Sequence, residues 1–167
     1  GRVLQVGTRA EVFRRPASAF VARFVGAQNL FPVLEADRRH NTVKLAEAMV
    51  LATGPLPEAG ELLAMIRPEE IAVCGDGEAG ARQWTLARVD DRGRLVRRYR
   101  RRKLQLRRLQ WTLARVDDRG RLVRLTLRGP LPLQVTMTPQ AFAAAGVAEG
   151  QAVAASWAPG AVHVLPA

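Results

Sequence analysis

The sequence predicts a mainly β fold, a small barrel with a short α/β segment at its N-terminus and an inserted basic hairpin repeat. From residue 30 onward, short apolar runs alternate with Asn, Gly and Pro, which is typical of an all-β unit. Helix signals are confined to three places in the chain. The 167 residues, 48% of them apolar and 25% charged, are enough to bury a core in one medium domain or two small ones.

The first 15 residues predict a strand and then a short helix. Residues 2–6, Arg-Val-Leu-Gln-Val, can form a short strand that Gly7 closes. Thr8 and Glu11 have the spacing of a capping box, in which the hydroxyl accepts from the Glu11 amide and the carboxylate reaches back. The helix should run to about Arg15.

A second helix is predicted directly afterwards. Pro16 suits the first turn of a helix, because its missing N–H would have no partner there. Phe20, Val21 and Phe24 then supply an apolar face at helical spacing, and Gly26 is a plausible end.

The remaining chain predicts strands and one further helix. In that helix, Thr138 is the N-cap, Pro139 takes the first position and Gly146 ends the helix. The predicted strands are 30–34, 42–45, 49–52, 62–66, 71–74, 84–89, 122–127, 133–137, 152–157 and 162–165.

An internal repeat interrupts this pattern. Residues 83–97 recur without a change at 110–124, and the segment 98–109 that joins them matches neither flank. Each copy predicts a strand, an Asp-Asp-Arg-Gly turn and a second strand. Old structural repeats diverge, so the identity indicates a recent local duplication or an assembly error. A barrel needs one such hairpin, and this sequence contains two copies of it.

The net charge of +11 is concentrated in the segment between the copies. Eight basic residues and no acid lie in 97–108, which leaves about +3 for the rest of the chain. Such a tract can neutralise phosphates of nucleic acid or anionic lipid, but a solvated loop created with the duplication is the favoured interpretation. A nucleic-acid partner is not favoured, because no recognition helix or stacking motif accompanies the tract. The candidate polyanion-binding residues are Arg98, Arg100, Arg101, Arg102 and Lys103.

Several kinds of chemistry are not predicted for this chain. The chain has only two lysines, Lys44 and Lys103, and neither follows a glycine in a phosphate-binding loop, so the sequence predicts no ATP hydrolysis and no catalytic residue. The single Cys74 excludes an internal disulfide, and His40 and His163 have no second histidine at metal-ligand spacing. No apolar run approaches the roughly 20 residues that span a bilayer, so any membrane contact should be peripheral.

Three segments resemble the C-terminal part of ABC importer ATP-binding subunits. Residues 1–16, with 20–26 and Asn29, closely resemble the end of the nucleotide-binding domain and its link to the regulatory domain. Residues 65–71, Met-Ile-Arg-Pro-Glu-Glu-Ile, are similar to an Ile-Arg-Pro-Glu motif of that regulatory domain. The tail from 135 to 165 resembles the TOBE barrel, an OB-like, molybdate-binding-like domain of the molybdate, tungstate and sulfate members.

The resemblance implies a domain division and a set of partners. Residues 1–27 would be the end of the nucleotide-binding domain with its linker helices, and residues 28–167 a TOBE-like regulatory domain. It implies a cytoplasmic subunit at the inner face of the membrane, docked on permease subunits and homodimeric partly through its regulatory domains. ATP and Mg would belong to a nucleotide-binding domain that precedes Gly1, and this chain itself would carry no cofactor or metal.

The resemblance also indicates a candidate oxyanion site. Molybdate-binding members have a Ser-Ala-Arg-Asn stretch there, and this sequence has Gly80, Ala81, Arg82 and Gln83. Those members also have a lysine soon after a serine in the last-strand region, whereas Ser156 is followed by Trp157 and Ala158. Two donors are therefore lost and one is lengthened. Arg82 could still attract an anion, but a solvated salt bridge is the commoner role for an arginine at a strand edge. The candidate oxyanion ligands are Arg82, Gln83, Ser156 and His163.

The sequence leaves two other functions open. One is a stand-alone oxyanion-binding protein, which needs the same candidate ligands but no ATP-binding partner. The other is a cationic binder of nucleic acid or lipid, which needs only the basic segment.

Overall fold

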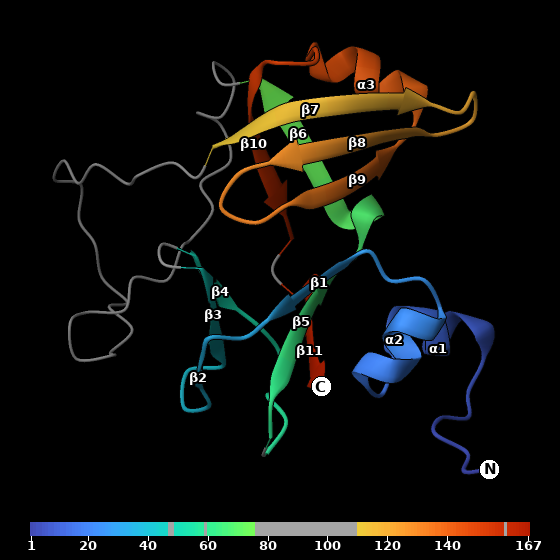
Figure 1. The fold of residues 1–167 in the computed structure, drawn as a ribbon, viewed down its shortest axis with the longest axis vertical. Coiled ribbons are helices and arrows are strands. Elements are labelled where there is room, and N and C mark those ends of the chain that lie inside the picture. The colour runs from blue at the N-terminus through green and yellow to red at the C-terminus, as the bar shows by residue number, and fades with distance from the viewer. Residues whose placement is uncertain (47–48, 59, 76–109, 159) are drawn as a thin grey trace, which may run out of the picture.

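The computed structural model describes residues 1–46, 49–58, 60–75, 110–158 and 160–167, and within them the fold is mainly β (Figure 1). The strand pairs are antiparallel and build three sheets. The five-stranded sheet has the order β6 (Ile71–Gly75), β10 (Ala152–Trp157), β7 (Trp111–Asp118), β8 (Val123–Arg128), β9 (Leu133–Met137). The two three-stranded sheets are β1 (Asn29–Pro32), β5 (Leu62–Ile66), β11 (Val162–Pro166) and β2 (Glu35–Asp37), β3 (Thr42–Ala46), β4 (Met49–Ala52).

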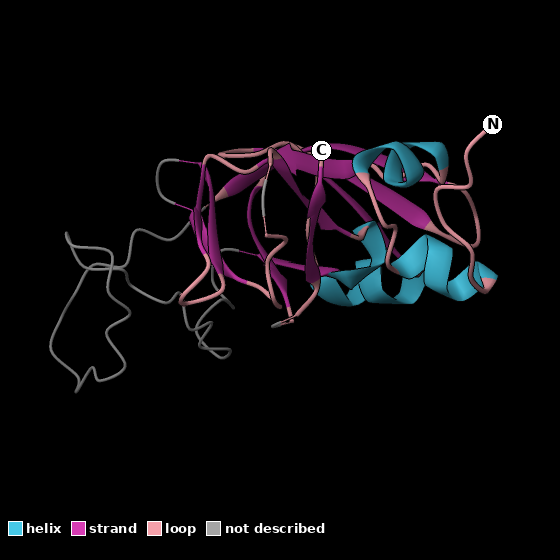
Figure 2. Cartoon of the chain, turned by 90° about the horizontal axis from the view of Figure 1, so that it is seen from below, coloured by secondary structure: helices cyan, strands magenta, loops and turns pink. Residues whose placement is uncertain are grey.

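Helices occupy a small share of the described chain. They are α1 (Arg9–Arg14), α2 (Ala19–Phe24), α3 (Pro139–Ala145) and the short 3₁₀ helix η1 (Pro68–Glu70). Figure 2 shows that they gather toward one end of the molecule, while strands and loops make up the rest of what is described. The mainly β prediction is confirmed.

One apolar core is shared by all three sheets. Phe31 from β1, Val43 from β3, Leu113 from β7 and Leu125 from β8 belong to a single cluster of buried side chains. The middle strand β5 is buried at all five positions, because one of its faces lines this core and the other faces α2. Sheet strands buried on both faces read as continuous apolar runs, as Leu62–Ile66 does.

Most predicted elements within the described residues form, with boundaries shifted by one or two positions. The capping box of Thr8 and Glu11 starts α1, and Thr138 caps α3, which ends at Gly146 in a left-handed conformation with φ 60°. The strand β2 and the 3₁₀ helix η1 were not predicted. The predicted strand at 84–89 lies outside the described residues.

The predicted strand at 2–6 is wrong. These residues pair with no strand, and Val3, Leu4 and Val6 are exposed. Instead, the Gln5 side chain donates to the Arg15 carbonyl (3.0 Å) and accepts from a backbone amide beyond it. A strand needs a neighbouring strand for its backbone groups, and the described chain places none beside this segment.

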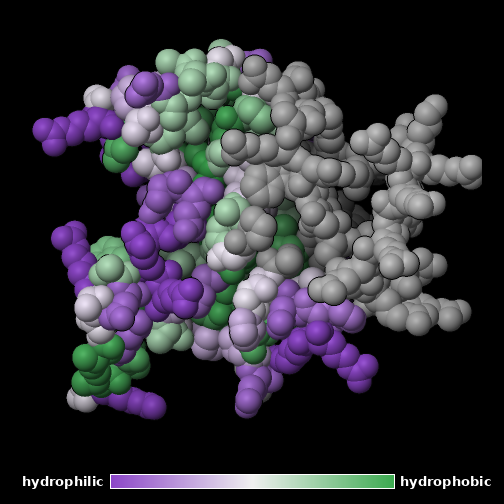
Figure 3. All heavy atoms as spheres, turned by 180° about the vertical axis from the view of Figure 1, so that it is seen from behind, coloured by the Kyte–Doolittle hydropathy of each residue, from purple (hydrophilic) through white to green (hydrophobic). Residues whose placement is uncertain are grey.

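The predicted second helix is correct in outline but wrong in its start and its buried face. Ser18 is the N-cap, so Pro16 precedes the helix instead of opening it. Phe20 and Phe24 stack on each other at 6.4 Å and are 64% and 82% exposed. Figure 3 shows apolar side chains gathered at the lower left, at the N-terminal end of the molecule. The buried residues of α2 are Ala19, Val21 and Ala22, so Val21 is the one member of the predicted apolar face that is buried.

The second copy of the repeat forms the predicted hairpin. Residues 111–118 are β7, and the turn into β8 is closed by the Asp118 carboxylate, which accepts from the Gly120 amide at 2.8 Å. The Trp111 indole is 2% exposed and donates to the Leu131 carbonyl at 2.9 Å. The first copy, 83–97, and the connector, 98–109, lie outside the described residues.

Candidate functional site at the N-terminal joint

The N-terminal helices meet the β barrel at a joint that combines polar links with a small apolar contact. Helix α1 buries no residue of its own, so polar links hold it. The Glu11 carboxylate accepts from the Thr8 backbone amide at 2.8 Å, and this hydrogen bond, with a second from the Thr8 hydroxyl, holds the pKa of Glu11 below its usual value. The capping box therefore fixes α1 without help from the core.

Arg67 links the barrel to the C-terminal end of α1. It follows β5 directly, and its Nη1 donates to the carbonyl of Phe13 at 3.2 Å. The guanidinium is held in place by Glu69, whose carboxylate accepts from Nε at 2.7 Å and also from Nη2. A cation at this end of a helix also interacts favourably with the carbonyls of the last turn.

His163 supplies a second link from another strand. Its ring Nε2 lies 3.2 Å from the carbonyl oxygen of Pro16, which fits donation from the Nε2–H tautomer. His163 is on β11, opposite Met65 of β5, so both links to the N-terminal segment come from the same three-stranded sheet.

A small apolar cluster completes the joint. Ala19 and Ala22 of α2 pack on Leu63, Met65 and Leu165, and these five side chains form a cluster separate from the main core. Beside the joint, a groove of about 1240 Å³ runs between the end of α2, η1 with β6, and α3. The segment 65–71, with its Ile-Arg-Pro-Glu motif, lines this groove.

Asn29 ties the chain that leaves α2 to the five-stranded sheet. Its side chain is 0% exposed, with Nδ2 donating to the Gln134 carbonyl and Oδ1 accepting from the Gln134 amide, both at 2.8 Å. The amide group thus pairs with the backbone of β9 as a neighbouring strand would. Sequence reasoning assigned no role to Asn29, although this residue was part of the resemblance.

Two of the four candidate oxyanion ligands lie in the described part of the chain, and these two belong to different sheets. Ser156 is on β10, opposite Ala72 in the five-stranded sheet, whereas His163 is in another sheet and faces the Pro16 carbonyl. Arg82 and Gln83 lie outside the described residues. So do the candidate polyanion-binding residues Arg98, Arg100, Arg101, Arg102 and Lys103.

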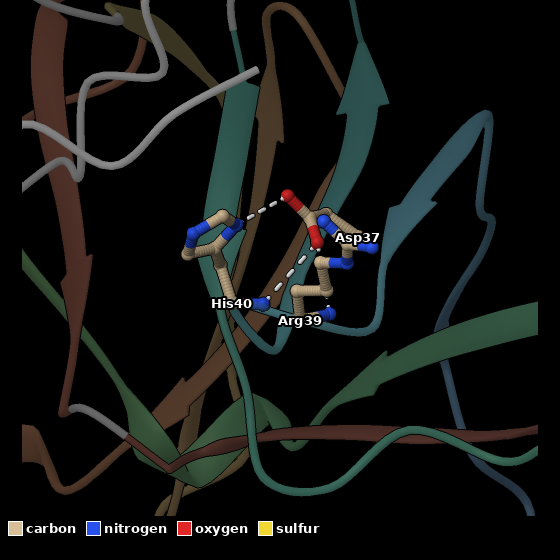
Figure 4. Close-up of polar contacts among 3 residues, drawn as sticks. All are labelled: Asp37, Arg39 and His40. Carbon is tan, nitrogen blue, oxygen red and sulfur yellow. Dashed lines mark hydrogen bonds and ion pairs between the residues drawn. The ribbon is translucent and has the colours of Figure 1, made fainter.

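His40 belongs to a turn that closes the β2–β3 hairpin (Figure 4). Its Nδ1 lies 2.6 Å from Oδ2 of Asp37, while Oδ1 of Asp37 accepts from the backbone amides of Arg39 and His40. The His40 hydrogen bond is the main reason that the pKa of Asp37 lies below its usual value.

The part of the chain that the structure describes holds no cluster of His, Cys, Asp and Glu suited to a metal ion. None of the helices described is long and apolar enough to cross a membrane.

Comparison with known proteins relates the chain to importer subunits. A molybdate/tungstate import ATP-binding protein of Pyrococcus horikoshii is 30% identical over 171 residues, which cover 99% of this chain and 40% of that protein. A sulfate/thiosulfate import ATP-binding protein of Chromobacterium violaceum is 44% identical over 92 residues, 54% of this chain and 24% of that protein. The homologues of this chain are ATP-binding subunits of ABC importers.

The relationship to ABC importer subunits covers only part of each relative. An sn-glycerol-3-phosphate import ATP-binding protein of Paracoccus denitrificans is 44% identical over 77 residues, 45% of this chain and 21% of that protein. The chain therefore spans between a fifth and two fifths of the length of these relatives. No protein-family model matches the chain.

The fold resembles that of the cytoplasmic molybdate-binding protein ModG in a crystal form with molybdate bound. The TM-score is 0.56 at 18% sequence identity, and the match covers 85% of this chain and 98% of that one. This confirms the predicted OB-like, TOBE-like barrel.

Proposed function

We propose that this chain is the C-terminal regulatory and dimerisation segment of an ABC importer ATP-binding subunit, for an oxyanion such as molybdate or sulfate. The observation that carries the proposal is the alignment of 99% of the chain with 40% of a molybdate/tungstate import ATP-binding protein. The remaining length of such a subunit would hold the nucleotide-binding domain, with its ATP and Mg. Residues 1–27 would be the last elements of that domain, and residues 28–167 the regulatory domain.

The joint is the part of the structure suited to a regulatory role. Any movement of α1 relative to the barrel must break or carry along the Arg67 link to Phe13 and the His163 link to Pro16. Both links end on the three-stranded sheet whose other face lines the main core. A displacement of the N-terminal segment would therefore be transmitted to the barrel through β5.

The exposed apolar surface of the N-terminal segment supports the proposed division at residue 27. Val3, Leu4, Phe20 and Phe24 are between 51% and 82% exposed. Exposed apolar patches of this kind mark surfaces that another protein part covers. In the proposal, the rest of the nucleotide-binding domain covers the apolar surface formed by these four side chains. The whole subunit would act at the cytoplasmic face of the membrane, with permease subunits and a second copy of itself.

The DNA upstream of the Gly1 codon provides the decisive test. An uninterrupted reading frame that encodes a P-loop is expected. A stop codon in that frame, close to Gly1, would overturn the proposal. The purified chain should neither bind nor hydrolyse ATP, because Lys44 and Lys103 lie outside any glycine-rich loop.

The role of the joint can be tested by hydrogen exchange on the Arg67→Gln variant. The amides of α1 should exchange faster, since the variant removes the charged link to Phe13, while the amides of β7 and β8 should keep their protection. Arg23→Gln is the matched control, because Arg23 is exposed on α2 and the described structure gives it no link to the barrel. Equal protection of α1 in the two variants would exclude Arg67 as a coupling residue.

A stand-alone oxyanion-binding protein is the second candidate, and the match to 98% of the ModG chain favours it. Equilibrium dialysis of the purified chain against molybdate, tungstate and sulfate separates the two functions. Saturable binding that Arg82→Ala removes and Arg23→Ala leaves intact would support the second candidate. If no saturable binding is found, the regulatory function in an importer subunit remains, since that function requires no ligand in this chain.

A further inference from the structure

Side chains from two distant parts of the chain bind three successive backbone groups in the corner between α1 and α2. The Gln5 amide donates from Nε2 to the Arg15 carbonyl at 3.0 Å and accepts at Oε1 from the Ala17 amide at 2.8 Å. Between these two groups, the Pro16 carbonyl oxygen lies 3.2 Å from Nε2 of His163. Pro16 is buried and its ring fixes φ, so these contacts define the conformation of the corner.

One peptide group joins the bond from Gln5 to the bond from His163. The Pro16 carbonyl and the Ala17 N–H belong to the same planar unit, in which they point in opposite directions. Gln5 therefore holds one side of this unit and His163 holds the other. A rotation that breaks the bond to Gln5 also turns the carbonyl away from the imidazole. Hydrogen bonds in such a chain also polarise one another.

The Gln5 side chain ties residues 1–6 to the rest of the described chain. Apart from its two bonds, no hydrogen bond within the described structure reaches these six residues. Val3, Leu4 and Val6 are exposed, so packing contributes little to holding them in place. A displacement of residues 1–6 therefore acts on the corner through Gln5.

His163 connects the corner to the barrel. It is on β11, where its Cα partner is Met65 of the buried strand β5. Met65 belongs to the small apolar cluster beneath α2. This connection is separate from that of Arg67, which reaches the end of α1 and not the corner.

We propose that Gln5 is a positioning residue, which couples residues 1–6 to β11 through the Pro16–Ala17 peptide group and His163. The inference rests on the proposed function, in which residues 1–6 belong to the nucleotide-binding domain and β11 to the regulatory domain. A movement of the first domain then reaches the second through one peptide group, and no ligand is needed. The coupling is reciprocal, because a coupling free energy between two sites acts equally in both directions.

The two histidines of the chain allow a direct test by NMR of their ring nitrogens. His163 reports on the Pro16 carbonyl, while His40 of the β2–β3 turn, bound to Asp37 at 2.6 Å, is the internal reference. The measurement is made at about pH 8, where an ordinary imidazole is neutral. Gln5→Leu should shift the ring nitrogen signals of His163 and lower the share of its Nε2–H tautomer. The signals of His40 should stay unchanged.

A control variant and amide exchange complete the test. Gln28→Leu makes the same substitution at an exposed glutamine beyond α2 and should leave the signals of both histidines unchanged. The Ala17 amide should exchange roughly fivefold faster in Gln5→Leu, the factor that corresponds to one typical net hydrogen bond. Because the coupling is reciprocal, His163→Phe should also speed the exchange of this amide, by roughly twofold.

Two results would overturn the proposal. If the His163 signals of Gln5→Leu match those of Gln28→Leu, then Gln5 does not position the Pro16 carbonyl. If the His40 signals move together with those of His163, then the substitution disturbs the whole fold and not the corner alone. Either result leaves the proposed importer function standing, because the reading frame upstream of the Gly1 codon tests that function separately.

Discussion

Replacing Asn29 should destabilise the protein more than any other single polar substitution at the joint. Asn29→Ala removes both hydrogen bonds to Gln134 and leaves that residue's backbone amide and carbonyl without these partners in a partly buried place. Two net hydrogen bonds of about 1 kcal/mol, with the further cost of unpaired buried groups, give a loss of about 2–4 kcal/mol. Since small domains have only about 5–15 kcal/mol of stability, this change should be easy to measure.

Urea unfolding at neutral pH, followed by circular dichroism, measures the loss. The urea concentration at the midpoint should fall. The dependence of the free energy of unfolding on urea concentration should stay constant, because the surface exposed on unfolding is unchanged. Gln28→Ala is the matched control, since the Gln28 side chain is exposed, and it should stay within about 0.5 kcal/mol of the parent protein. A loss below about 1 kcal/mol for Asn29→Ala would refute the reasoning.

The Asn29→Asp variant adds a test with a defined sign. Its carboxylate could accept from the Gln134 amide but would also face the Gln134 carbonyl, so burial and repulsion should raise its pKa above the ordinary value of about 3.9. For a raised pKa, the stabilising contribution is complete below the unfolded-state pKa and is lost as pH rises through the folded-state pKa. The difference in free energy of unfolding between Asn29→Asp and the parent protein should therefore become smaller as pH falls from 7 towards 4. A difference that stays constant over this range would contradict the assigned hydrogen bonds.

Four further predictions concern other parts of the molecule. Gly129→Ala should lower the thermal midpoint and perturb tryptophan emission, because its Cβ would lie 2.5 Å from Trp111 and 2.9 Å from the Gln110 carbonyl oxygen. Deletion of residues 98–124 should preserve the melting transition, because the remaining copy then runs directly into Leu125; an unfolded product would make the repeat structural. Replacing Arg100, Arg101, Arg102 and Lys103 with Ser should abolish any salt-sensitive affinity for nucleic acid or anionic vesicles with little change in melting, and binding that persists would favour a polyanion-binding function. In His40→Ala, the pKa of Asp37, followed by carboxyl NMR, should rise towards 3.8, and no rise would exclude the His40 bond as its main cause.

Local signals account for what the sequence predicted correctly. The capping box of Thr8 and Glu11 and the cap at Thr138 act within four residues, so they could be read directly. The strands followed from apolar runs between turn residues. The predicted strand at 2–6 was wrong, and Phe20 and Phe24 of the predicted apolar face are exposed, because pairing and burial depend on what the rest of the chain places nearby.

The joint could be predicted only in part, because its links join distant positions. Arg67 lies in a motif that the sequence made visible, but its partner Phe13 is 54 positions away. Asn29 and Gln134 are separated by 105 positions, and His163 and Pro16 by 147. No periodicity or local spacing indicates such pairs. His163 was predicted as an anion ligand, and its Nε2 contact with the Pro16 carbonyl oxygen could not be predicted from the sequence.

The position of β5 bears on how the chain folds while it is being synthesised. All five residues from Leu62 to Ile66 are buried, and one of the two neighbours of β5 is β11, which the ribosome makes after every other described strand. Until residues 162–166 emerge, one edge of this apolar strand has no partner. Unpaired apolar edges are prone to aggregate, so a nascent chain stalled before residue 162 should depend on chaperones. The folding of this domain is therefore completed late, after most of its core residues have already left the ribosome.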